Sequence, residues 1–443
     1  MKVQYYTLSR HSRKTLEPDT FHRVPHEQTN WPFSAWLLRP YLNLTPYEQG
    51  PIHSRGIDAA YRQLTDIEMT VLPLQSHPSC VLRQTIIREN DLDQFTVQHP
   101  RELPDQLRTD RWQYLVECIE AYPDLCPEQQ IRLVTLLARL GFYHLIIDLI
   151  PPDINDRISQ DTYSARMAAK RCIAVHKLTP GKQIYVDILR EIALSAPGDH
   201  HVRLLAATAL IVFFGRKRSD IEDIRYWVKI AENEYWCLEP GTDWRDSVYA
   251  SMYWRAVAFE PFNSGDRQAT AEYLDQAEHY AYAVSANSEI QKIVRDENIH
   301  PLLETRRKEA LWLRNLDLAY ERARALVEHD PFDPKVHIQM GDVLLTRDDP
   351  IQALKAYRQA VFLGTPYTPF AWFMIGYCEE ALGNLEEACY AYQSALRIDP
   401  WGITPAQRLI KVARRLNQPV LAQWAENILE TVGIRYKLTR NVK

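Results

Sequence analysis

The stretch PFAWFMIGYCEEALGNLEEACYAYQSALRIDP, residues 369–400, decides the fold of this chain. Its apolar residues recur at three- and four-residue spacing, which predicts two helices. Gly383-Asn384 interrupts the pattern near its middle, and Pro400 closes it. Asn384 and Glu387 have the spacing of a capping box, which marks the start of the second helix. The stretch therefore predicts one pair of antiparallel helices.

The preceding segment, residues 334–368, has the same layout, with a second capping box at Asp349 and Gln352. Small and aromatic residues return 35 positions apart, as Gly341 and Gly376, Ala353 and Ala388, Tyr357 and Tyr392, and Ala360 and Ala395. Glycine and alanine let two helix backbones approach, while the tyrosine fills the space toward the next pair. Repetition at this interval is typical of stacked helix pairs.

Helical periodicity extends upstream to about residue 106, with turn signals at regular intervals. Breaks near Pro152, Pro197, Pro240 and Ala286 lie about 45 residues apart, and later breaks lie about 34 apart. Each interval also holds a central turn signal, so each predicts one helix pair. The chain as a whole is thus predicted to be all-α, with about eight antiparallel helix pairs.

Residues 334–400 resemble the tetratricopeptide repeat family, and residues 300–433 do so more weakly. In the weaker part, Arg307 stands where glycine is expected and Glu426 where an aromatic residue is usual. The resemblance implies a right-handed α-solenoid whose first helices line a concave groove. In this family the groove binds extended peptides or partner helices.

The resemblance also implies which side chains line the groove. The inward-facing positions proposed for partner binding are Phe370, Phe373, Tyr377, Ile338, Asp342, Lys308, Arg408 and Lys411. Such a groove is aromatic at its centre and basic toward one end, and we expect a protein or peptide partner in it. The three aromatic residues have a second interpretation, because core packing produces the same spacing of three and four.

Proline content divides the chain, since 10 of the 27 prolines fall within residues 1–105. Long helices are excluded there. We expect an irregular N-terminal region at 1–105, with short strands at 3–8 and 81–87, packed on the solenoid. The other predicted regions are helical-hairpin units of about 45 residues at 106–286, tetratricopeptide units at 287–433 and, after a break at Gly433, a basic C-terminal tail at 434–443.

Composition limits the environment and the partners. The 443 residues include 14 glycines, a low share that disfavours turn-rich β folds, and the net charge of −5 does not predict nucleic-acid binding. The longest apolar run, about 11 residues at 204–214, is too short to span a membrane. An odd set of seven cysteines without CxxC, and no apolar leader, indicate a cytoplasmic protein. Nothing in the sequence fixes the oligomeric state.

No enzyme signature is present in the sequence: it contains no Walker loop, no GxSxG, no HExxH and no dinucleotide fingerprint. We therefore expect a non-enzymatic scaffold or adaptor without catalytic residues, metal or cofactor. Asp199-His200-His201 opens a predicted helix, and the natural role of Asp199 there is an N-cap rather than a metal ligand.

Two alternatives stay open. His22 and His26 lie four apart and, with His53, could contribute to a metal site in the N-terminal region, which would make the chain a metal-dependent or substrate-modifying enzyme whose solenoid presents the substrate. The second alternative is a peptide-sensing regulator, in which groove occupancy alters a downstream partner.

Overall fold

The computed structural model describes residues 100–102 and 110–440, apart from 141, 179–182, 218–220, 286, 288, 330–333, 364–367 and 400–401. The predicted strands and His22, His26 and His53 lie outside the described residues. The described chain forms two compact units, an N-terminal unit that ends at Glu309 and a C-terminal unit that begins at Ala310. This part of the chain is all-α and contains no strand, which confirms the predicted fold class.

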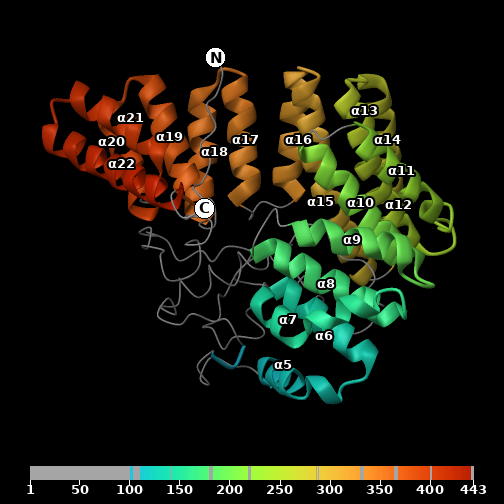
Figure 1. Ribbon diagram of the computed structural model, residues 1–443. Coiled ribbons are helices and arrows are strands. Elements are labelled where there is room, and N and C mark those ends of the chain that lie inside the picture. Colours follow the sequence, from blue (N-terminus) through green and yellow to red (C-terminus); the bar gives the residue numbers. More distant parts are fainter. Residues whose placement is uncertain are drawn as a thin grey trace. The chain divides into compact units, whose positions relative to one another are not determined.

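The N-terminal unit is built from consecutive helices that pack in pairs (Figure 1). Its elements are η3 (Pro100–Glu102), α5 (Asp110–Glu120), η5 (Tyr122–Asp124), α6 (Pro127–Leu140), α7 (Tyr143–Leu149), η6 (Pro152–Arg157), α8 (Thr162–Leu178), α9 (Gln183–Ser195), α10 (His200–Lys217), α11 (Ile221–Tyr235), α12 (Trp244–Val257), α13 (Phe259–Ser264), α14 (Arg267–Ala283) and α15 (Glu289–Trp312). The last residues of α15 belong to the C-terminal unit.

α10 is the centre of the N-terminal unit. It contacts α8, α9, α11, α12 and α13, and its residues from Leu204 to Ile211 are all buried. A helix that is apolar on every side is stable in water only when other elements surround it. The apolar run that is too short for a membrane span is therefore the core helix of this unit.

Aspartates start several helices of this unit by accepting backbone N–H bonds. Asp161 accepts from Ser164 N at 2.7 Å at the start of α8, and Asp266 accepts from Ala269 N at 3.0 Å at the start of α14. Each cap satisfies one of the N–H groups that a helix leaves without an internal partner. The caps fix where each helix begins.

The C-terminal unit continues the series with α16 (Leu316–His329), α17 (Pro334–Thr346), α18 (Pro350–Leu363), α19 (Thr368–Leu382), α20 (Leu385–Ile398), α21 (Ile403–Arg415) and α22 (Pro419–Arg440). From α16 to α22, each helix packs on the next helix of the chain, as the orange and red ribbons of Figure 1 show. α17, α19 and α21 are the first helices of three successive pairs.

Two details of this unit differ from the sequence prediction. Gln352 N donates to Asp349 Oδ1 at 3.0 Å, as the capping box predicts, but the side chain of Asn384 does not cap α20. Its Nδ2 donates instead to Glu379 Oε2 at 2.8 Å. The predicted break at Gly433 is also wrong, because α22 continues through it to Arg440. A single glycine costs a helix only about 1 kcal/mol, which a long packed helix tolerates.

Candidate functional site

Two glycine–tyrosine contacts set the distance between paired helices in the C-terminal unit. A Cβ atom added at Gly341 would lie 2.6 Å from the ring of Tyr357, and one added at Gly376 would lie 2.6 Å from the ring of Tyr392. Both tyrosine side chains are fully buried. Glycine is needed at these positions because a tyrosine ring occupies the space of a side chain.

The tyrosine hydroxyls reach acidic residues on the first helices. Tyr357 donates to Asp342 Oδ1 at 2.8 Å, and Tyr392 donates to Glu380 Oε2 at 2.8 Å. Burial, and next the negative charge of Glu380, raise the pKa of Tyr392, so its hydroxyl keeps the proton that it donates. Arg408 Nη1 also bonds Glu380, at 3.2 and 3.3 Å from the two carboxylate oxygens.

Among the residues predicted to bind a partner, the structure brings Tyr377 and Arg408 together. The Arg408 guanidinium lies 5.2 Å from the centre of the Tyr377 ring, within the range of a cation–π interaction. Lys411 is exposed farther along α21, and Phe370 on α19 is partly buried. Lys308 is exposed on α15, in the N-terminal unit, and its contact with a partner stays a prediction.

Three of the predicted contact residues are buried. Phe373 is 1% exposed, Ile338 is 6% exposed and Tyr377 is 7% exposed, and all three belong to the hydrophobic core of the C-terminal unit. The Phe373 ring centre lies 5.8 Å from that of Tyr392. This burial favours the core interpretation of Phe373 and Tyr377, and the contact of all three residues with a partner stays a prediction.

Sequence reasoning missed Glu379, a buried carboxylate beside Glu380. Its Oε1 accepts from Arg358 Nη2 at 2.7 Å and its Oε2 from Asn384 Nδ2 at 2.8 Å. The two bonds compensate the loss of hydration that burial of a carboxylate brings. The signal that could have found it is a charged residue directly after the apolar run from Phe370 to Cys378.

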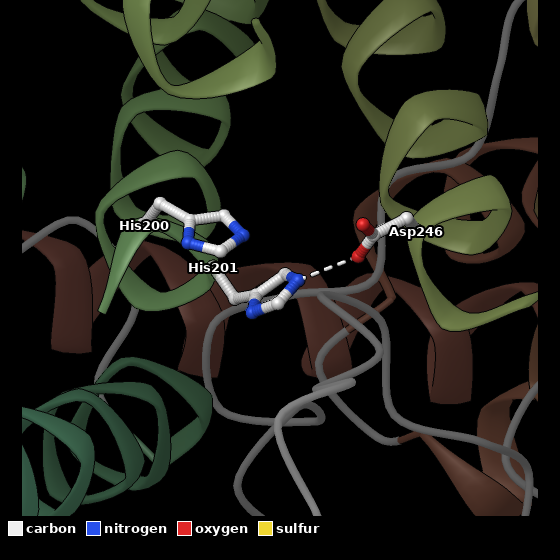
Figure 2. A group of neighbouring side chains, drawn as sticks. All are labelled: His200, His201 and Asp246. Carbon is white, nitrogen blue, oxygen red and sulfur yellow. Dashed lines mark hydrogen bonds and ion pairs between the residues drawn. The ribbon is translucent and has the colours of Figure 1, made fainter. Parts of the chain in front are cut away.

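A second polar cluster lies in the N-terminal unit where α10 begins (Figure 2). Asp199 Oδ1 accepts from the backbone N of His201 at 3.1 Å and of Val202 at 3.2 Å, so Asp199 caps α10 as predicted. The ring of His201 reaches across to the first turn of α12, where its Nε2 lies 2.7 Å from Asp246 Oδ1. Sequence reasoning did not connect Asp246 with the histidines.

His200 completes this cluster. Its ring centre lies 3.9 Å from that of His201, and its Nε2 is buried without a hydrogen-bond partner. Burial, and next the charge of His201, lower the pKa of His200. One potential ligand atom from each of His200, His201 and Asp246 lies within 4.8 Å of the others.

Comparison with known proteins finds a family match within the C-terminal unit. Residues 369–400 match the family model described as tetratricopeptide repeat. The general transcriptional corepressor ssn6 of Schizosaccharomyces pombe is 28% identical over 142 residues, which are 32% of this chain and 11% of the corepressor. The chain thus spans only 11% of the length of this curated relative.

Solved structures of two other proteins are similar at low identity. A solved chain of MamA from Desulfovibrio magneticus RS-1, from residue 41 to its end, is 18% identical with a TM-score of 0.32, over 43% of this chain and 96% of the solved chain. The APC/C hetero-tetramer Cut9-Hcn1 gives 11% identity and a TM-score of 0.27, over 80% of this chain and 90% of the matched chain. With TM-scores this low, neither likeness assigns a function.

Consecutive helix pairs, closed by buried glycine–tyrosine contacts, define this chain as a helical-repeat protein. The matched segment makes the class specific, since residues 369–400 form a tetratricopeptide repeat. This supports a protein-interaction scaffold as its function at the coarse level. Among the described helices, none is both long and apolar enough to cross a membrane.

Proposed function

We propose that this protein is a non-enzymatic adaptor that binds a protein or peptide partner in a groove along α17, α19 and α21. The tetratricopeptide match and the succession of three packed pairs support this role. Fold alone does not define a partner, so the chemistry of the contact must come from side chains on these helices.

The basic character of α21 carries the proposal. Its basic residues are Arg408, Lys411, Arg414 and Arg415, and it has no acidic residue. Arg408 is bound to Glu380 inside the unit, whereas Lys411 and Arg415 are exposed. A cluster of one charge sign on an exposed helix face attracts the opposite charge. The partner segment is therefore expected to carry acidic side chains where it passes α21.

Apolar contact is expected next to this basic helix, on α19. Phe370 is the only partly buried member of the predicted aromatic group Phe370, Phe373 and Tyr377, whose other two members are buried. Aromatic side chains that keep some exposed surface are common anchors at interfaces. The proposed partner thus combines an apolar side chain over α19 with acidic side chains over α21.

A charge reversal on α21, matched by one on a second helix, tests the proposal. Lys411→Glu and Lys355→Glu each reverse one exposed lysine, the first on α21 and the second on α18. Full-length wild type and both variants are immobilised, and proteins captured from lysate of the native host are quantified by mass spectrometry. We expect a partner whose recovery falls about 10-fold with Lys411→Glu, as for loss of a charge contact, and stays unchanged with Lys355→Glu.

The captured partner then allows a direct measurement of affinity. The ratio between the dissociation constants of Lys411→Glu and wild type should decrease at high salt, because screening weakens exposed charge contacts. A partner lost equally with both lysine variants, or with neither, would contradict the groove as the binding surface.

The two alternatives, an enzyme site around residues 1–105 and a peptide-sensing regulator, stay predictions. The regulator alone predicts a change in compactness on partner addition, measured by solution scattering.

A further inference from the structure

We propose that His200, His201 and Asp246 bind a divalent transition-metal ion of the Zn²⁺ type, which links the start of α10 to the first turn of α12. This site lies in the N-terminal unit and is independent of the partner surface on the C-terminal unit. The three side chains point toward one another in Figure 2, and one potential ligand atom of each lies within 4.8 Å of the others.

The unpaired nitrogen of His200 is the first observation that points to a ligand. His200 Nε2 is buried and has no hydrogen-bond partner. A buried nitrogen without a partner costs free energy, and folded proteins rarely keep one without a reason. A metal ion beside His200 Nε2 would give this atom the partner that the helices do not supply.

The other two ligands are held in place by bonds that leave their metal-facing atoms available. Asp246 Oδ2 accepts from Glu239 N at 2.7 Å, which orients the carboxylate and leaves Oδ1 directed at the histidines. The backbone of His201 is fixed by the Asp199 cap, and its ring packs 4.5 Å from that of Tyr249. Supporting contacts of this kind are typical around metal ligands.

Binding requires only a small rearrangement of the cluster. Zinc bonds to histidine nitrogen and carboxylate oxygen are about 2.0–2.2 Å long, so the ligand atoms of a tetrahedral site lie roughly 3–3.5 Å apart. The His201–Asp246 contact of 2.7 Å has to open and His200 has to move inward. The ion takes the place of the proton between His201 Nε2 and Asp246 Oδ1. In a neutral imidazole that proton moves through solvent to Nδ1, which lies 3.8 Å from Asp199 Oδ1, and in an imidazolium it leaves to solvent.

The ligand set selects the class of metal. Two imidazoles and one carboxylate suit zinc and neighbouring transition metals, whereas calcium and magnesium prefer oxygen ligands alone. Three protein ligands leave a fourth position for water or for a group from a binding partner. Since α10 and α12 belong to successive helix pairs and contact each other, the ion would make the stability of the N-terminal unit depend on metal.

The test compares two matched histidine variants of the full chain. His200→Gln removes the unpaired ligand, and His144→Gln removes an exposed histidine of the same unit on α7. Untagged wild type and variants are stripped with a chelator, and Zn²⁺ binding is followed by calorimetry, by metal content after dialysis and by hydrogen exchange. Histidines outside the described residues, such as His22 and His26, are retained in both variants. Any zinc that they bind therefore contributes equally to the three proteins and does not affect the comparison.

We expect wild type and His144→Gln to bind one more zinc equivalent than His200→Gln, or to bind it more than about 100-fold more tightly. Loss of a supporting residue alone costs about 10–100-fold in affinity. Zinc should also slow exchange at the start of α10 and the first turn of α12 in wild type but not in His200→Gln. Circular dichroism and exchange without zinc verify that the variant is folded. Equal zinc binding by all three proteins, no binding by wild type, or protection confined to other helices would each overturn the proposal.

Discussion

Phe373→Ala separates the two interpretations of the aromatic residues on α19. The Phe373 side chain is 1% exposed and packs beside the Tyr392 ring. Truncation of a buried phenylalanine loses its transfer free energy and leaves a cavity, at a cost of about 3–5 kcal/mol. At roughly 2–4 °C per kcal/mol, the melting transition of the C-terminal unit should fall by about 6–20 °C.

Hydrogen exchange with mass spectrometry on the full chain measures this loss locally. Peptides from α19 and α20 should exchange faster in Phe373→Ala, while peptides from α10 in the other unit provide an internal reference. Phe370→Ala is the matched control, since Phe370 is on the same helix but only partly buried, and it should cost less than about half as much. A loss below about 1 kcal/mol in Phe373→Ala, combined with weakened partner binding, would refute the core assignment.

Two further predictions concern the packing of the C-terminal unit. Gly376→Ala should lower the melting temperature of this unit, because overpacking against the Tyr392 ring costs about 1–3 kcal/mol. This cost exceeds the stabilisation that the higher helix propensity of alanine contributes. Gly241→Ala is the control and should be nearly neutral, because nothing lies within 4 Å of a Cβ atom added there. Burial raises the pKa of Cys378 to about 12. A thiol reagent at pH 8 should therefore label exposed Cys126 but leave Cys378 unmodified until the protein is denatured. Fast labelling of Cys378 in the native protein would contradict this prediction and show that the thiol is accessible.

The paired architecture could be predicted from sequence because it depends on contacts with fixed spacing. Gly341 and Gly376 each face a tyrosine 16 positions later, as Gly341 with Tyr357 and Gly376 with Tyr392 show. A local rule fails where a side chain finds a partner outside its own motif. Asn384 has the spacing of a capping residue but bonds the buried Glu379 of the preceding helix, and no capping pattern contains that information.

The candidate sites were predicted less completely, for the same reason. Asp199 could be identified as a cap because its partners are the next residues of the chain. Asp246 lies 45 positions from His201, and only packing of α12 on α10 brings them together. On α19, spacing placed Phe370 and Phe373 on one face but did not distinguish partial from complete burial.

The predicted boundary between residues 286 and 287 stays a prediction. The chain passes from the N-terminal unit to the C-terminal unit between Glu309 and Ala310.

The helices α16 to α22 contact mainly their immediate neighbours in the chain. This pattern has a consequence for how the protein folds during its synthesis on the ribosome. Contacts between residues close in sequence can form as soon as both helices have emerged, without waiting for distant segments. Each pair can then serve as the template on which the next one docks. The C-terminal unit is thus expected to fold progressively during translation, in the order in which its helices are synthesised.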